Sequence, residues 1–107
     1  MPMREPTYFV LASLIDGPLH GYGIIKRAEA LSGGRVRLAA GTLYGALDRL
    51  AAEGLVEVER EERVSGRERR YYRLTGAGVE ALTQEAERLA SAASVVASRI
   101  SARVQPA

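Results

Sequence analysis

The sequence of 107 residues contains no cysteine and no tryptophan, and it has one histidine. The missing cysteines exclude a disulfide framework, a thiolate metal site and a cysteine nucleophile. No segment is apolar and long enough to span a membrane, and the first residues lack the layout of a secretory signal peptide. We therefore expect a cytoplasmic protein that forms one small unit, whose limited core favours association with a partner.

The residues of an enzyme or a metal site are also missing. A catalytic histidine needs an oriented partner and a nucleophile, and His20 has neither nearby in the sequence. The acidic residues do not fall at chelating spacing, and the glycines lack the strand and the lysine of a nucleotide-binding loop. We predict no catalytic residue, no metal and no cofactor. His20 is expected either to cap a helix or to hydrogen-bond a phosphate or a neighbouring helix.

Residues 40–50 carry the most informative pattern. Leu43, Leu47 and Leu50 recur at helical spacing, which predicts a helix with one buried face. A helix that enters a DNA major groove needs such an apolar back and little bulk on its front. An ordinary amphipathic helix with a solvated face is the alternative. The residues away from the leucines are Thr42, Tyr44, Gly45, Asp48 and Arg49.

Two short runs with a two-residue period follow this helix. Val56 and Val58 alternate with glutamates, and residues 69–74 alternate in the same way, which predicts two half-buried strands. Ser65 and Gly66 supply the turn between them. A helix followed by such a hairpin is typical of a winged helix-turn-helix. Helices are also expected at residues 6–15 and 21–31, the second with Tyr22, Ile25 and Ala28 inward.

The charges of the hairpin are separated along the chain. Residues 53–62 hold five acids and one arginine, whereas residues 63–73 hold five arginines and one acid. Opposite charges on paired strands stabilise a hairpin modestly. We expect some of these pairs to form while arginines near the turn stay available for phosphate. The candidates for phosphate contact are Arg63, Arg67, Arg69 and Arg70.

The C-terminal third carries a second pattern, which we call the α-helical seam. Its apolar residues follow one another at steps of three and four over three heptads. A helix of about 40 Å, at roughly 1.5 Å per residue, would overrun so small a domain, so we favour dimerisation over packing on the chain's own first helix. The seam comprises Val79, Leu82, Ala86, Leu89, Ala93, Val96 and Ile100.

The chain resembles the PadR family of bacterial transcriptional regulators, in a short form with a single C-terminal dimerisation helix. The resemblance covers roughly residues 5–80 and rests on the runs His20-Gly21-Tyr22, Gly41-Thr42-Leu43-Tyr44 and Tyr71-Tyr72-Arg73-Leu74-Thr75. It implies that the first and last helices build the dimer, with Tyr8, Phe9 and Leu11 joining the seam. Family members often carry Ser-Pro before the Gly-Thr-Leu-Tyr run, where this chain has Ala39 and Ala40.

Some short relatives bind flat aromatic compounds between subunits by stacking on a tryptophan, at the position that Leu89 holds here. The absence of tryptophan disfavours that mechanism. Tyr8, Phe9 and Leu89 remain candidates for lining an apolar pocket for a small-molecule effector, although a filled interface core is the simpler expectation.

We interpret the chain as mainly α with a small β-hairpin: a winged helix-turn-helix at residues 1–75 and a dimerisation helix at residues 76–107. The predicted function is a homodimeric repressor that binds a pseudo-palindromic operator in double-stranded DNA. Arg49 is the candidate for reading guanine, and Thr42 and Tyr44 for phosphate. His20, Tyr22 and Gly45 complete the DNA-binding set. The alternatives are a winged-helix module that binds protein, and a small-molecule-binding dimer without DNA binding.

Overall fold

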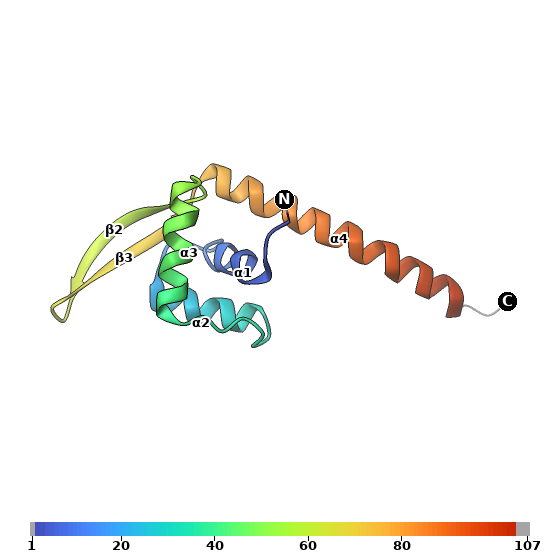
Figure 1. Cartoon of the computed structure of the whole chain (residues 1–107), viewed down its shortest axis with the longest axis horizontal. Coiled ribbons are helices and arrows are strands. Elements are labelled where there is room, and N and C mark those ends of the chain that lie inside the picture. Colours follow the sequence, from blue (N-terminus) through green and yellow to red (C-terminus); the bar gives the residue numbers. More distant parts are fainter. Residues whose placement is uncertain (1, 105–107) are drawn as a thin grey trace.

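The structure is a computed structural model that describes residues 2–104. A body of short helices carries a β-hairpin on one side and a long helix on the other, so the molecule measures 68 × 26 × 21 Å (Figure 1). This architecture confirms the expected fold class. The elements in chain order are α1 (Glu5–Ser13), β1 (Leu19–His20), α2 (Gly21–Leu31), α3 (Ala40–Ala52), β2 (Val56–Val64), β3 (Arg67–Leu74) and α4 (Gly76–Val104).

The core lies where α1, α2 and α3 meet the base of the hairpin and the start of α4. Leu43, Leu47 and Leu50 are almost completely buried, which confirms the apolar face predicted for α3. In α2 the buried residues are Gly21, Ile24 and Ala28. The prediction that Tyr22 points inward is wrong, because its side chain is 65% exposed at the first turn of the helix. The remaining buried core residues are Val10, Leu11, Leu14, Val36, Val56, Tyr72 and Leu82.

Backbone hydrogen bonds define both ends of α3. Ala39 occupies the N-cap position, where its carbonyl accepts from the N–H of Leu43 over 3.0 Å and its side chain makes no hydrogen bond, because alanine lacks the oxygen that serine would supply. At the other end Gly54 adopts a φ of +77°, and the N–H of Leu55 donates to the carbonyl of Leu50 over 2.9 Å. This is a Schellman-type stop, in which glycine tolerates the left-handed conformation.

The hairpin of β2 and β3, which we call the wing, belongs to a three-stranded antiparallel sheet in the order β1-β3-β2. Ser65 and Gly66 both have positive φ, as in a type I′ turn. A bulge at Glu59 shifts the register between Val58 and Arg60. Only the base of the wing is covered, so the expectation of burial holds for Val56 and fails for Val58, which is 43% exposed. The two-residue strand β1 was not expected, because so short a segment has no periodicity.

A compact junction joins the wing to α4. The Thr75 hydroxyl donates to the carbonyl of Gly54 over 2.6 Å and accepts from the N–H of Gly78 over 3.0 Å. Gly78 lies against the backbone carbonyl of Leu55, where a Cβ atom would collide with it. The start of α4 therefore depends on glycine at this position.

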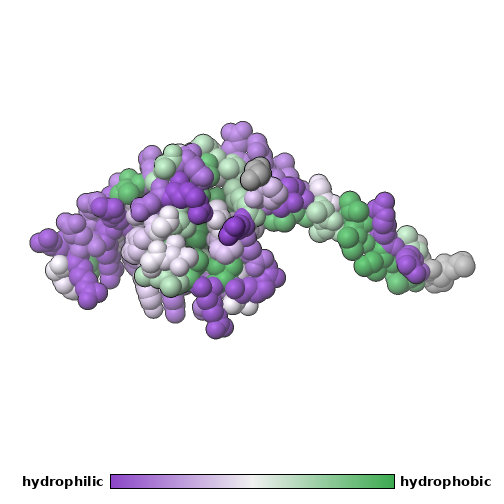
Figure 2. All heavy atoms as spheres, viewed as in Figure 1, coloured by the Kyte–Doolittle hydropathy of each residue, from purple (hydrophilic) through white to green (hydrophobic). Residues whose placement is uncertain are grey.

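The seam helix α4 begins at Gly76 and runs for 29 residues, roughly 44 Å at about 1.5 Å per residue. Leu82 and Glu85 are buried against the body, and the Glu85 carboxylate accepts hydrogen bonds from the Met3 N–H and from Arg88. These bonds, led by that from Arg88, lower the pKa of Glu85. From Glu87 onward every described residue is exposed, and Figure 2 shows apolar side chains along this projecting part.

Candidate nucleic-acid interface

The outward face of α3 around Gly41 and Gly45, which we call the bare face, carries almost no side-chain atoms. Gly41 and Gly45 lie one turn apart and are exposed, and an added Cβ atom at either would meet no atom within 4 Å. Thr42 and Asp48 are the exposed polar residues beside them. A helix with this surface can bring its backbone close to a flat or grooved partner. Gly41 was not among the residues predicted to contact DNA, although it lies four positions before Gly45 in the sequence.

Tyr44 connects α3 to the start of α2. A Cβ atom at Gly21 would lie 2.5 Å from the Tyr44 hydroxyl oxygen, so the phenol ring rests directly on this glycine. Tyr44 nevertheless keeps 47% of its surface exposed. The contact places the first turns of the two helices side by side, and a larger residue at Gly21 would separate them.

His20 caps α2, which was one of its two expected roles. Its Nδ1 accepts a hydrogen bond from the N–H of Gly23 over 3.2 Å. We assign the neutral tautomer with its proton on Nε2, since Nδ1 acts as an acceptor. The imidazole stacks beside Tyr22, with centroids 6.5 Å apart, and meets Tyr71 edge-on at 5.4 Å. The contact with Tyr71 could not be predicted from the local sequence, because it depends on the pairing of β1 with β3.

These groups line a groove of about 360 Å³ between the start of α2 and the wing, which we call the α2–wing groove. Six of the ten residues predicted to contact DNA are brought together here. Thr42 and Gly45 lie on α3, and Arg63 lies opposite Glu68 on the wing. The groove is lined by His20, Gly21, Tyr22, Tyr44, Arg67, Glu68, Arg69 and Arg70.

Ion pairs divide the arginines of the wing into two groups. Arg70 pairs with Glu61 over 3.1 Å and Arg73 with Glu57 over 2.6 Å. Arg60 pairs with two glutamates and lies 4.0 Å from the centroid of the Tyr71 ring. Within residues 2–104, no ion pair involves Arg63, Arg67 or Arg69. The wing thus carries both paired and unpaired arginines, but Arg70, which was expected among those available to phosphate, belongs to the paired group.

The pKa shifts on the wing follow the same contacts. The guanidinium of Arg60 lowers the pKa of Glu62 by hydrogen bonding to its carboxylate. The pKa of Arg70 is raised, first by the Tyr72 hydroxyl and then by the charge of Glu61. These groups are therefore charged at neutral pH, and the wing presents fixed charges to any partner.

Arg49 lies apart from the α2–wing groove. It sits in the last turn of α3, where its guanidinium donates to the hydroxyl of Thr7 on α1 over 3.1 Å. The side chain therefore bends toward α1, and reading of a base by Arg49 would require this bond to break. Sequence spacing placed Arg49 away from the leucines but gave no sign of the partner on α1.

The residues predicted for a dimer interface fall into two groups. Leu11 and Leu82 face the chain's own core, and Tyr8, Phe9 and Ala86 are half-buried. The exposed residues of the seam are Val79, Leu89, Ala93, Val96 and Ile100.

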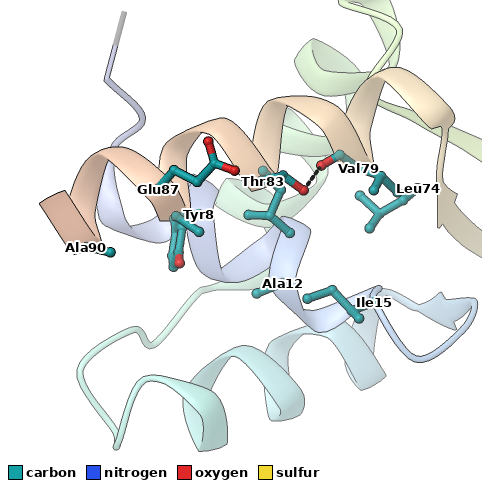
Figure 3. Close-up of a pocket in the computed structure, with 10 residues that line it drawn as sticks. Tyr8, Ala12, Ile15, Leu74, Val79, Thr83, Glu87 and Ala90 are labelled. Atoms are coloured by element: carbon teal, nitrogen blue, oxygen red, sulfur yellow. Dashed lines mark hydrogen bonds between the residues drawn. The ribbon is translucent and has the colours of Figure 1, made fainter.

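A second groove of about 600 Å³ opens between α1 and α4. Figure 3 shows Tyr8 and Ala12 of α1, and Ile15 of the turn that follows α1, below Val79 and Thr83 of α4. Tyr8, Phe9 and Leu89 meet around a smaller cavity of about 240 Å³. Ile15 is 63% exposed and was not among the predicted interface residues. The unpaired apolar surface therefore continues from α4 onto α1.

The family model described as "Transcriptional regulator PadR-like family" matches residues 10–84, which include α3, the wing and the first turns of α4. The chain belongs to this PadR-like family. The resemblance inferred from the sequence is thereby confirmed. Since PadR-like proteins are transcriptional regulators, the expectation of a protein that is not an enzyme is confirmed as well.

Two related sequences extend this comparison. The chain is 41% identical over 76 residues to the transcriptional regulator Rv3488 of Mycobacterium tuberculosis, covering 71% of this chain and 67% of that protein. It is 46% identical over 90 residues to a 37.1 kDa protein of transposon TN4556 from Streptomyces fradiae, covering 84% of this chain. The chain spans only 24% of the length of that transposon protein.

Solved structures share the PadR-like fold. A PadR family regulator from Clostridium difficile superposes with a TM-score of 0.74 at 23% identity, over 91% of this chain and 99% of that one. Bacillus subtilis PadR in complex with operator DNA gives a TM-score of 0.66 at 27% identity, over 76% of this chain and 47% of that one.

The described residues contain neither a cluster of metal ligands nor a membrane-spanning helix. Among residues 2–104, no three histidine, aspartate or glutamate side chains gather where they could hold a metal ion. In the same part of the chain, no helix combines the length and the apolar character needed to cross a membrane.

Proposed function

We propose that this PadR-like chain binds operator DNA as a homodimer, with α3 in the major groove and the wing against the backbone. The observation that carries the proposal is the position of the α2–wing groove beside the bare face of α3. One face of the molecule thereby offers both a thin helix and unpaired arginines. This combination suits a duplex, whose groove admits a helix while its phosphates attract cations. Bacillus subtilis PadR, to which the chain is similar in fold, is bound to operator DNA in its solved structure, and this supports DNA binding by the present chain.

In this proposal the N-terminal half of α3 reads the groove. Gly41 and Gly45 let the helix backbone approach the base edges, and Thr42 supplies a hydroxyl beside them. Tyr44 lies toward the α2–wing groove and contacts phosphate. Arg49 is a secondary candidate for base reading, because its bond to Thr7 holds it at the far end of α3.

The backbone contacts come from the wing and the start of α2. Arg67 and Arg69 line the groove without an ion pair among the described residues, so their guanidinium groups are available to phosphate oxygens. Tyr22 presents a hydroxyl at the first turn of α2, and His20 presents Nε2–H as a donor while its Nδ1 stays on Gly23. These contacts position the protein on the duplex but do not specify its sequence.

The dimer in this proposal forms through α4 and the neighbouring face of α1. Leu89, Val96 and Ile100 expose between 41% and 57% of their surface at heptad spacing. A second copy of the helix would remove this apolar surface from water. Residues 1–75 would then form the DNA-binding part and residues 76–107 the dimerisation part. Two-fold symmetry would match a pseudo-palindromic operator with half-sites about one helical turn apart.

We further propose that the dimer represses transcription by occupying its operator, because a bound dimer denies the same DNA to other proteins. A small molecule that fills the apolar groove between α1 and α4 would compete with the partner subunit for Tyr8 and Val79. An effector of that kind would act on the assembly of the dimer rather than on the α2–wing groove.

The test is the salt dependence of binding to duplex DNA. Replacing both Arg67 and Arg69 by alanine should weaken binding to all duplexes alike. It should also flatten the slope of the logarithm of the binding constant against the logarithm of the salt concentration, which we call the log-log salt slope, by about 0.9 per lost contact. The matched control replaces Arg99 and Arg103 of α4, which removes the same charge far from the wing and should leave the slope unchanged. A wing variant that keeps the parent's slope would show that these arginines do not contact phosphate.

A further inference from the structure

Arg70 occupies an unusual place among the arginines of the wing. Its side chain lines the α2–wing groove beside Arg67 and Arg69, where a phosphate is proposed to lie. Unlike those two, it is bound to a carboxylate, with Arg70 Nε 3.1 Å from Glu61 Oε1. Both side chains remain at least half exposed, so the pair can open to solvent without disturbing the core. The groove therefore contains one arginine, Arg70, whose guanidinium is already bound to a carboxylate.

The bulge at Glu59 creates this pairing. Before the bulge, Val58 lies opposite Tyr72; after it, Arg60 lies opposite Tyr71 and Glu61 opposite Arg70. If Glu59 were paired with Tyr71 in a regular ladder instead of being bulged, Arg60 would lie opposite Arg70, because each step along one strand is one step back along the other. The bulge thus replaces a contact between like charges by an ion pair. It also places Arg60 on the Tyr71 ring.

The wing offers a second pair of the same kind outside the groove. Arg73 is bound to Glu57 at the base of the wing, with 2.7 Å between Nε and Oε1. Arg73 does not line the α2–wing groove. Removing either glutamate changes the net charge by the same amount, but only the loss of Glu61 releases an arginine next to the proposed phosphate.

We propose that Glu61 sets the strength of sequence-independent DNA binding by holding Arg70 away from the phosphate backbone. This inference rests on the proposed function. A phosphate that approaches the groove must compete with Glu61 for the same guanidinium, and the carboxylate also repels it. The wing then binds the backbone through its unpaired arginines alone, so its affinity for arbitrary duplexes stays low.

The experiment measures binding to a random-sequence duplex over a series of salt concentrations, with the parent, Glu61→Gln and the matched control Glu57→Gln. Glu61→Gln should steepen the log-log salt slope by about 0.9, the value of one added phosphate contact. At moderate salt its affinity should rise by about fivefold at most, because an exposed ion pair contributes only weakly. Glu57→Gln should keep the parent's slope.

Arg70→Ala completes the test. In the parent it should leave the slope unchanged, and in Glu61→Gln it should restore the parent's slope. The inference is overturned if Glu61→Gln keeps the parent's slope, if Glu57→Gln steepens it equally, or if Arg70→Ala alone flattens it. If the parent binds no duplex at all, both the proposed function and this inference fail. If the parent binds duplex DNA but Glu61→Gln keeps its slope, only the inference fails.

Discussion

Replacing Gly45 by alanine should stabilise the protein while weakening its binding to DNA. Glycine inside a helix costs about 0.5–1 kcal/mol relative to alanine. At Gly45 the added methyl group meets no atom within 4 Å, so this gain is not offset by a collision within the protein. For a domain of this size, the gain corresponds to a rise in Tm of roughly 2–8 °C.

The effect on binding has the opposite sign, because the open space in front of Gly45 is where the duplex is proposed to lie. A methyl group forced into a close-packed contact costs about 1–3 kcal/mol, which corresponds to an affinity for the preferred duplex that is lower by about 5-fold to 150-fold. A residue with only a structural role would not separate stability from binding in this way.

The assay pairs thermal unfolding, followed by circular dichroism at one fixed protein concentration, with fluorescence anisotropy on labelled duplex. Fixing the concentration matters because the Tm of a dimer depends on it. The control is Gly76→Ala, which adds the same methyl group to the first turn of α4 and also meets no atom within 4 Å. It should leave DNA binding unchanged. If Gly45→Ala binds like the parent, the bare face of α3 does not approach DNA.

Three further predictions concern the dimer, the junction and acid stability. Leu89→Glu should give a monomer or an unfolded chain in sedimentation, since it buries a carboxylate against the partner, whereas Ser91→Glu on the outer face of α4 should remain dimeric. Gly78→Ala should lower the unfolding free energy by about 1–3 kcal/mol or more in denaturant titrations, because its methyl group collides with backbone. Because the pKa of Glu85 is lowered in the folded protein, its ionised carboxylate stabilises the fold at pH values above the ordinary pKa of a carboxyl group. This stabilisation is lost as the pH falls through the pKa that Glu85 has in the folded protein. In Glu85→Gln the Tm should therefore fall less between neutral and acidic pH than it does in the parent. If the two proteins show the same dependence of Tm on pH, Glu85 does not contribute to acid stability.

The elements that follow from periodic apolar residues were predictable from the sequence. Leu43, Leu47 and Leu50 predicted the buried face of α3, and α4 begins at Gly76, as expected. The strand β1 was not predictable, because a two-residue segment acquires its structure only by pairing with Tyr71 and Tyr72. The pattern of residues within a short segment does not reveal a strand partner that lies some fifty residues away in the chain.

The candidate site was predictable in its residue types and only partly in its geometry. The spacing of the arginines suggested a wing that contacts phosphate, but only the bulge at Glu59 decides that Glu61 faces Arg70. Helical periodicity likewise placed Arg49 on an exposed side of α3. Its hydrogen bond to Thr7 depends on how α1 packs against α3, which no local pattern encodes.

The most direct test of the account is a binding selection on randomised duplexes with the unmodified protein. We predict enrichment of a pseudo-palindromic sequence whose half-sites lie about one helical turn apart, as two copies of α3 related by the dimer axis require. Recovery of an unenriched pool, or of a single half-site without its symmetry mate, would contradict the account of a dimer that reads DNA with α3.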